Sequence, residues 1–340
     1  MTHPPAGFDT ASIGRWISQR FGVSDFDVEV MSIGRSNLTF TITVDGRPRW
    51  VLRRPPLGHE GGSAHNVARE GRIMAALTDS TVPVPTVLDI VDDPEVLDVP
   101  FVFMDHCPGF AINTPSDWSS IPDESKPDCA FGMIDALAAI HSVDIDAVGL
   151  GDLRRPGGLI ERQLRRWLGQ VEHIATRETP MIHEVHDVLL ESMPDPAGSP
   201  VGLAHGDFKP NNMIFAPGGG LNAVVDWELT AVGEVLTDLG YFIAMLTVPE
   251  EYTSIWVPTP ADGFPDTEAL IARYQEVSGH EVHDVGYYSA FAMWKLACIR
   301  EGVYTRLKAG QMGDLDLDPD VAGEGVEDLA GQALTLLEKS

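Results

Sequence analysis

The sequence changes character once, near residues 107–109, and this change most limits the folds that the chain can adopt. Before it lie short β-branched runs separated by turn residues, whereas apolar residues after it recur at helical spacing. A chain of 340 residues has room for two such parts, each with its own core. We therefore predict a β-rich unit over residues 1–105 and a mostly helical unit over residues 106–340.

The first part predicts a five-stranded, mainly antiparallel sheet with one helix. Asp45-Gly46 is a strong signal for a tight hairpin turn, and Pro55-Pro56 marks the end of the strand that follows it. Apolar residues at helical spacing indicate a helix over residues 66–77. The expected strands cover residues 28–33, 39–44, 49–53, 84–91 and 101–104.

The second part predicts a mainly helical unit. Its one exception is residues 201–227, where a polar loop is followed by two short apolar strands at residues 214–215 and 223–225. The expected helices cover residues 128–141, 158–174, 184–192, 234–245, 267–277, 284–306 and 326–338. Together the two parts indicate an α+β fold with a small β-rich lobe and a large, mainly helical lobe.

The charge and hydropathy of the chain limit its partners and its location. It has 51 acidic and 23 basic residues, a net charge of −28, so it would repel a nucleic-acid backbone. We interpret this acidity first as a solubility feature and only second as an attraction for a cationic substrate. The longest mostly apolar run, residues 239–248, is too short to span a bilayer, and residues 1–10 lack the pattern of a secretory signal. Three widely spaced cysteines are typical of a reducing compartment, so we expect a cytoplasmic protein with no membrane partner.

The strongest chemical signal is a polar loop followed by a carboxylate at the end of an apolar strand. The loop reads His205-Gly206-Asp207-Phe208-Lys209-Pro210-Asn211-Asn212, and Asp226 follows fourteen residues later. Phosphoryl transfer from ATP needs a carboxylate that orients the attacking hydroxyl and takes its proton, and oxygen ligands that hold Mg²⁺ on the triphosphate. Asp207 suits the first task, and Asn212 and Asp226 suit the second.

This pattern resembles the aminoglycoside phosphotransferase and choline kinase family, a branch of the protein-kinase-like fold. Protein kinases carry a His-Arg-Asp loop and an Asp-Phe-Gly segment at the corresponding places, and Lys209-Pro210 keeps part of the kinase pattern. The resemblance implies a bilobal fold with Asp207 as catalytic base and with Asn212 and Asp226 as metal ligands. It also implies that Asp238 braces the loop, and we expect His205 to have a structural role.

The first part of the chain matches the nucleotide side of this family, with one departure. By resemblance, residues 34–37 form the loop that covers the phosphates, with Ser36 as a contact. The family's strand lysine is absent, and Arg53 is the candidate substitute, paired with Glu70 seventeen residues later. Met104 belongs to a strand that resembles the hinge between lobes, where it would lie beside the adenine.

Two neighbouring residues of this half also carry expectations. Arg54 follows Arg53 on the same strand, and we expect it to be a solvated charge at the sheet edge. Asp226-Trp227-Glu228 replaces Asp-Phe-Gly, and without that glycine the segment should change conformation less easily. We therefore expect a metal site that is always assembled rather than an activation switch.

A group of arginines has two interpretations. Arg162, Arg165 and Arg166 fall on one face of the helix predicted over residues 158–174. They could form an anion site for a CoA phosphate or an acidic substrate, or they could form salt bridges to the acidic body of the protein. This segment and two in the first part resemble the kinase-like domain of some acyl-CoA dehydrogenases, a domain associated with phosphorylating hydroxyacyl-CoA.

We interpret the chain as an ATP- and Mg²⁺-dependent phosphotransferase that acts on a hydroxyl of a small molecule, such as an aminoglycoside or a hydroxyacyl-CoA. The alternative is a non-catalytic nucleotide-binding module, because the usual lysine is missing. The complete set of Asp207, Asn212 and Asp226 argues against that alternative. A protein kinase is disfavoured because no obvious activation segment lies between Asp226 and Asp238. The sequence makes no prediction of the oligomeric state.

Overall fold

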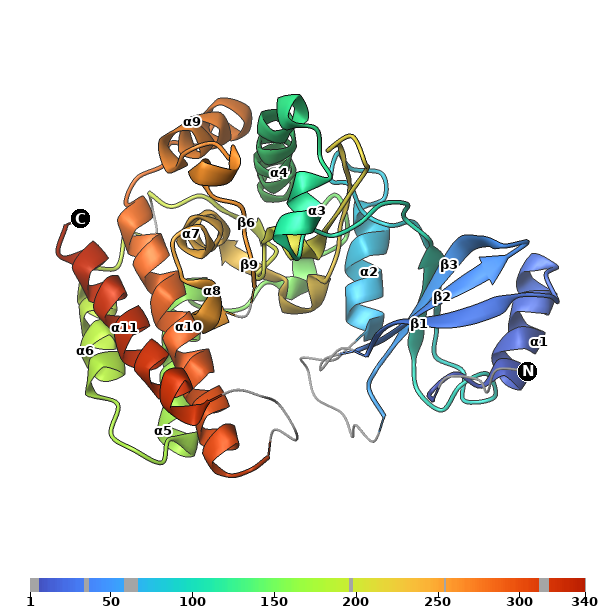
Figure 1. Cartoon of the computed structure of the whole chain (residues 1–340), viewed down its shortest axis with the longest axis horizontal. Helices are drawn as coiled ribbons and strands as arrows, with labels where there is room; N and C mark the ends of the chain where they lie inside the picture. The colour runs from blue at the N-terminus through green and yellow to red at the C-terminus, as the bar shows by residue number, and fades with distance from the viewer. Residues whose placement is uncertain are drawn as a thin grey trace. The chain divides into compact units, whose positions relative to one another are not determined.

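A computed structural model divides the chain into two compact units, which are described separately here (Figure 1). The first unit comprises Met1–Gly109 and Asn222–Leu229, and the second comprises Phe110–Leu221 and Thr230–Ser340. The structure describes residues 6–33, 37–57, 67–195, 198–253, 255–311 and 318–339.

The first unit contains the five-stranded antiparallel sheet that the sequence predicts. Its strand order is β1-β2-β3-β5-β4, and every neighbouring pair is antiparallel. Asp45 and Gly46 both have positive φ angles, 52° and 73°, and form the turn between β2 and β3, as Asp-Gly hairpins require. The strands are β1 (Asp27–Ile33), β2 (Leu38–Val44), β3 (Arg47–Arg54), β4 (Val87–Val91) and β5 (Phe101–Asp105).

Among the described residues of this unit, two α-helices occur, and only one of them was expected. α2 (Val67–Leu77) agrees with the prediction, whereas α1 (Thr10–Phe21) was missed. The Asp9 side chain caps α1 by accepting from two backbone N–H groups, and the helix ends at Gly22 in the left-handed conformation. Ile13 and Ile17, four residues apart, are fully buried in the core that covers the sheet.

The second unit is mainly helical, as predicted. Two-stranded sheets join β6 (Val201–Ala204) to β9 (Ala231–Glu234) and β7 (Met213–Phe215) to β8 (Leu221–Val224), the hairpin in which the chain passes between units. β6 and β9 were not predicted. The helices are α3 (Pro115–Ser119), α4 (Lys126–His141), α5 (Leu159–Ile174), α6 (Pro180–Glu191), α7 (Leu236–Met245), α8 (Glu250–Thr253), α9 (Thr267–Ser278), α10 (Val285–Lys308) and α11 (Pro319–Leu337).

Helix α7 is the centre of the second unit and carries part of the candidate site. All ten of its residues are buried, including Asp238 and Tyr241. Gly240 allows α7 to approach α10 closely, since a Cβ atom there would lie 2.4 Å from the Cβ of Tyr288. Any larger residue would separate the two helices and shift the side chains that they present to the loop after β6.

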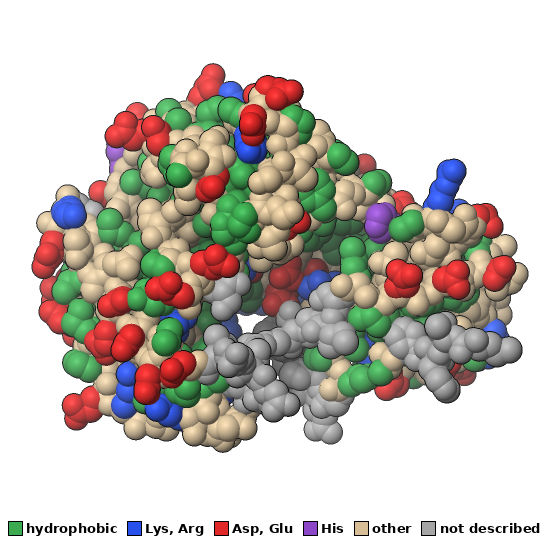
Figure 2. Space-filling view, viewed as in Figure 1, with side chains coloured by type: hydrophobic (Ala, Val, Ile, Leu, Met, Phe, Trp, Pro, Cys, Tyr) green, Lys and Arg blue, Asp and Glu red, His purple; other side chains and the backbone are tan. Residues whose placement is uncertain are grey.

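The surface agrees with the acidic composition. In the face drawn in Figure 2, Asp and Glu side chains are spread over the surface of each unit rather than gathered in one place. This distribution fits a general solubility role. Within the part of the chain that the structure describes, no helix is both long and apolar enough to cross a membrane.

Candidate functional site

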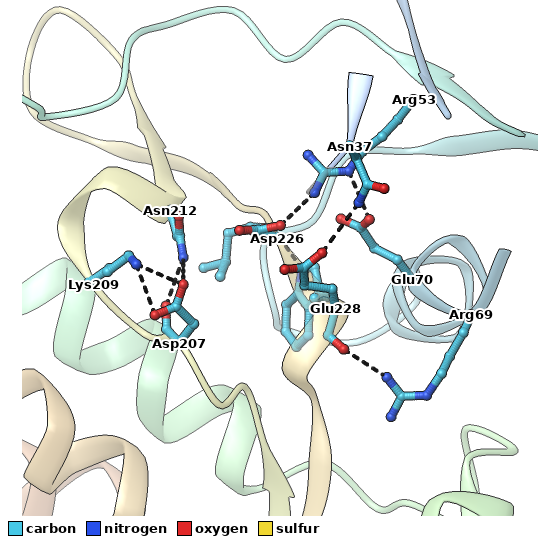
Figure 3. A network of polar contacts seen from close by, with 11 residues as sticks. Asn37, Arg53, Arg69, Glu70, Asp207, Lys209, Asn212, Asp226 and Glu228 are labelled. Carbon is cyan, nitrogen blue, oxygen red and sulfur yellow. Dashed lines mark hydrogen bonds and ion pairs between the residues drawn. The ribbon is translucent and has the colours of Figure 1, made fainter. Parts of the chain in front are cut away.

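The Asp207 carboxylate in the second unit is surrounded by hydrogen-bond donors. Lys209 Nζ lies 2.9 Å from Oδ1 and 2.8 Å from Oδ2, and the Asn212 amide donates to Oδ2 at 2.8 Å (Figure 3). The Tyr241 hydroxyl donates to Oδ1 at 2.9 Å. Burial raises the pKa of Tyr241 well above its usual value, so the phenol stays a neutral donor. Together these donors fix the orientation of the carboxylate.

Tyr241 was not among the residues singled out from the sequence. It lies three positions after Asp238 on α7, and residues three apart share one face of a helix. Once Asp238 is expected to brace the loop, that spacing points Tyr241 toward the same loop. The spacing between Asp238 and Tyr241 could therefore have identified Tyr241, but only after Asp238 had been assigned to the loop.

Asp238 braces the loop, as expected. Its Oδ2 accepts from the backbone N–H of His205 at 2.6 Å, and its Oδ1 accepts from that of Gly206 at 2.9 Å. Gly206 has a φ of 87°, a left-handed conformation that favours glycine. The fully buried His205 ring accepts from the backbone N–H of Asp207 at 3.3 Å, which confirms its structural role.

A buried histidine supports Asp238 from behind. His141 Nε2 lies 3.4 Å from Asp238 Oδ2, and His141 Nδ1 lies 2.6 Å from the Tyr274 hydroxyl. Since an ionised carboxylate can only accept, Nε2 carries the proton and Nδ1 accepts from Tyr274. Burial lowers the pKa of His141 despite the opposing effect of Asp238. For Asp238, burial acts to raise the pKa, but its hydrogen bonds and neighbouring histidines outweigh burial and lower it.

In the first unit, Arg53 pairs with two carboxylates (Figure 3). Its Nε lies 2.8 Å from Glu70 Oε2, as the sequence predicts, and its Nη2 lies 2.5 Å from Asp226 Oδ1. Burial acts to lower the pKa of Arg53, but attraction to Glu70 and Asp226 outweighs it and raises that pKa. Burial raises the pKa of Glu70, and the guanidinium offsets only part of that effect. The guanidinium thus uses two different nitrogens, one for each carboxylate.

The segment Asp226-Trp227-Glu228 is fastened within the first unit. The Trp227 ring is fully buried and donates to Val224 O at 2.9 Å. Asn37 donates to Glu228 Oε2 at 3.3 Å, and Arg69 donates to the backbone oxygen of Glu228 at 3.1 Å. Asp226 itself has a φ of 69°, a strained conformation that aspartate tolerates better than most residues.

Three other residues expected in this unit have different outcomes. Met104 is buried in β5 and pairs with Val51 of β3. Ser36 lies outside the described residues. The expectation that Arg54 is a solvated edge charge is wrong, because its side chain is only 4% exposed and donates to Gly7 O at 2.8 Å. The backbone at Gly7 packs against the end of β3, and its carbonyl oxygen accepts the hydrogen bond from the Arg54 guanidinium.

The three arginines of α5 are not equivalent. Arg162 donates to the backbone oxygens of Gly157, just before α5, and of Val232 in β9, among others. It therefore links the start of its helix to β9. Arg165 forms an exposed salt bridge with Glu161 at 2.6 Å. Arg166 makes no hydrogen bond or ion pair with any residue that the structure describes, and its guanidinium lies 5.7 Å from the Trp167 ring centre.

The two residues expected to bind a metal each present a suitable oxygen. Asn212 donates both hydrogen bonds to Asp207 from its NH₂ group, so its amide oxygen is not used in these bonds. Asp226 uses Oδ1 for Arg53 and has Oδ2 left as a ligand. Among the described residues, no three His, Cys, Asp or Glu side chains are grouped so that they could hold a metal ion by themselves.

Relatives and solved structures agree with this geometry. Acyl-CoA dehydrogenase family member 10 of Mus musculus is 33% identical over 287 residues, which cover 82% of this chain and 26% of that protein. Probable acyl-CoA dehydrogenase IBR3 of Arabidopsis thaliana is 31% identical over 336 residues, which cover 93% of this chain and 40% of that protein. The chain thus spans less than half the length of either relative.

Similar folds occur among aminoglycoside phosphotransferases. A candidate aminoglycoside phosphotransferase from Ralstonia eutropha JMP134 has a TM-score of 0.82 at 28% identity, covering 98% of this chain and 99% of that one. The GDP complex of a point mutant of aminoglycoside 2'-phosphotransferase-IIIa has a TM-score of 0.61 at 16% identity, covering 96% and 98%, and shows the fold alone. The protein-kinase-like fold and the expected resemblance, including the acyl-CoA dehydrogenase subgroup, are confirmed. Residues 27–277 match the phosphotransferase enzyme family, and the chain belongs to this family.

Proposed function

We propose that the protein transfers the γ-phosphoryl group of ATP to a hydroxyl of a small molecule. Asp207 orients the acceptor hydroxyl and takes its proton. Arg53, held by Glu70, contacts the nucleotide phosphates, and Met104 lies near the adenine. Family membership and the nucleotide complexes of similar structures support this assignment. Ser36 is proposed as a further phosphate contact.

We assign Mg²⁺ to the free oxygens of Asn212 and Asp226. When bound, the ion neutralises charge on the phosphates and polarises the group that is transferred. The protein's own part is to hold each of these side chains in place within its own unit. Asp226 is fixed by Arg53, and Asn212 is fixed by its two bonds to Asp207.

The observation that carries the proposal is the set of contacts on Asp207. The carboxylate that stabilises the loop, Asp238, is buried and accepts from two backbone N–H groups of that loop. Asp207 instead remains partly exposed, while Lys209, Asn212 and Tyr241 fix its orientation. Such a preoriented, accessible carboxylate is what transfer to a hydroxyl requires.

The first prediction tests this base. Asp207→Asn keeps the size of the side chain and removes its basicity, so we expect phosphoryl transfer to fall about 10³-fold. ATP binding should remain. The measurement is transfer from labelled ATP to a panel of hydroxylated metabolites, with nucleotide affinity from calorimetry.

The outcome also separates the enzyme from the non-catalytic alternative. Nucleotide binding without transfer to any acceptor by the wild type would favour a nucleotide-binding module. An Asp207→Asn protein that keeps full activity would exclude Asp207 as the base. Circular dichroism of both proteins checks that the fold is unchanged.

A further inference from the structure

A lysine that no sequence pattern indicated lies beside the loop that carries Asp207. Lys295 Nζ, from α10, donates to the backbone oxygen of Gly206 at 3.3 Å. The ammonium group also lies 5.7 Å from the Tyr241 ring centre and 6.0 Å from the Trp167 ring centre. Lys295 is therefore held next to the residue that precedes Asp207, between two aromatic rings.

This lysine has donors that the protein does not use. An ammonium group has three N–H donors, and the bond to Gly206 occupies one of them. In the part of the chain that the structure describes, no carboxylate lies within ion-pair distance of Lys295. A cation that is partly buried without a direct counter-charge is costly to the fold, and burial lowers the pKa of Lys295.

Lys295 and the charged groups around it are three cations and two carboxylates. Asp207 and Asp238 attract it, whereas Lys209 and Arg166 repel it. Asp238 is already bound to two backbone N–H groups, and Asp207 to Lys209. Three cations thus face two carboxylates that already have partners, in a protein whose net charge is −28.

From this juxtaposition we propose that Lys295 and Arg166 bind an anionic group, a carboxylate or a phosphate, on the phosphoryl acceptor. The proposal rests on the proposed function, since it places this anion on the molecule whose hydroxyl faces Asp207. The Trp167 ring lies against both cations and would pack against the carbon skeleton between hydroxyl and anion. A polycationic aminoglycoside would instead be repelled here.

The same helices show why Lys295 and Arg166 differ from ordinary surface cations. Lys308, thirteen residues further along α10, also lies over a tyrosine ring, 5.6 Å from that of Tyr304. It forms an ion pair with Asp320 at 2.9 Å, and its side chain is 44% exposed. Lys308 therefore has the counter-charge that Lys295 lacks, which makes it a matched control.

The experiment measures binding of three small probes that share a three-carbon chain with a hydroxyl and carry a negative, a neutral or a positive terminal group. They are 3-hydroxypropionate, its neutral amide and 3-amino-1-propanol, titrated into the full chain by NMR. We expect the carboxylate to bind about tenfold more tightly than the other two, the contribution of one charge-assisted hydrogen bond. Lys295→Met should abolish this preference, Lys295→Arg should restore most of it, and Lys308→Met should leave it unchanged.

Three results would overturn the proposal. They are equal or tighter binding of the amine, no saturable binding of the carboxylate, and a Lys295→Met protein that keeps the preference. A merely structural role for Lys295 would weaken all three probes alike. Because probe binding is measured without turnover, the anion site and the phosphotransferase activity are tested independently. Carboxylate binding without transfer to any acceptor counts against the function, whereas transfer with a preference for cationic acceptors counts against the anion site.

Discussion

In the first unit one guanidinium is held between carboxylates, whereas in the second unit one carboxylate is held between donors. Arg53 pairs with Glu70 and Asp226, and Asp226 keeps one oxygen that could bind a cation. Asp207 forms an ion pair with Lys209. Lys295 contacts the preceding residue, Gly206, and has unused donors. The local charge thus has opposite signs in the two clusters.

This difference teaches that net charge says little about a site. A value of −28 suggests an affinity for cations, yet the surroundings of Asp207 are positive. The acidic cluster suits a nucleotide that arrives with Mg²⁺, and the basic cluster suits an acceptor with its own negative charge. Each cluster can be tested by substituting a residue that determines its net local charge.

The largest effect is expected for Arg53, whose loss leaves a buried carboxylate without its partner. Arg53→Ala should lower the free energy of unfolding by about 3–5 kcal/mol, because Glu70 is only 2% exposed. Urea denaturation measures this. Arg53→Lys should lose less, since it keeps the charge but not both contacts.

A double variant sharpens the result for Arg53. In Arg53→Met with Glu70→Met, the most deeply buried charge is removed together with its partner, and only the more exposed Asp226 loses its guanidinium, so much of the lost stability should return. If Arg53→Ala costs less than about 1 kcal/mol, the pair behaves as a surface salt bridge, and its assigned role in holding Asp226 is not supported.

The next effect concerns Asp226 and the metal. Asp226→Asn keeps a residue type that tolerates the left-handed conformation and removes the negative charge. We expect affinity for ATP to fall about tenfold in the presence of Mg²⁺ and to stay unchanged in EDTA. Calorimetry under both conditions makes the comparison. An equal loss in EDTA would mean that Asp226 does not act through a metal.

Much of the fold could be predicted because its signals are local. The Asp45-Gly46 turn, the helix at residues 67–77 and the long helices of the second unit follow from neighbouring residues. The α1 helix was also readable from its cap at Asp9 and its end at Gly22. The strands β6 and β9 were missed, because they pair with each other across about thirty residues rather than through a local hairpin turn such as the one between β7 and β8.

The site was predictable only where its residues share one segment. Asp207 and Asn212 lie in one loop, and the Arg53 pair follows a known spacing. Tyr241 and Lys295 reach that loop from helices that begin later in the chain, and Lys295 is 89 residues from Gly206. Tyr241 could be inferred only from its spacing to Asp238, and the contact of Lys295 depends on how α10 packs, which no local pattern encodes.

The smallest expected effect is a change in the free energy of unfolding with pH, which arises from His141 behind the Asp207 loop. The buried His141 resists protonation, whereas in the unfolded chain it takes up a proton below about pH 6.5. The unfolded state therefore binds more protons as the pH falls, and stability is lost on the acidic side. Asp238, with its lowered pKa, keeps its own contribution over this range.

The expected loss from this histidine is at most about 1.4 kcal/mol per pH unit. His141→Gln removes the titrating group, so the stability difference between wild type and variant should shrink from pH 7 to pH 5. Urea denaturation at both pH values measures it. His283→Gln, at an exposed histidine with a carboxylate neighbour, controls for removing a histidine in general. A difference for His141→Gln that is constant with pH would mean that His141 has the same pKa in the folded and unfolded states. A difference that grows toward pH 5 would mean that His141 is already charged in the folded protein, and the hydrogen bond from Tyr274 to its Nδ1 could then not exist as assigned.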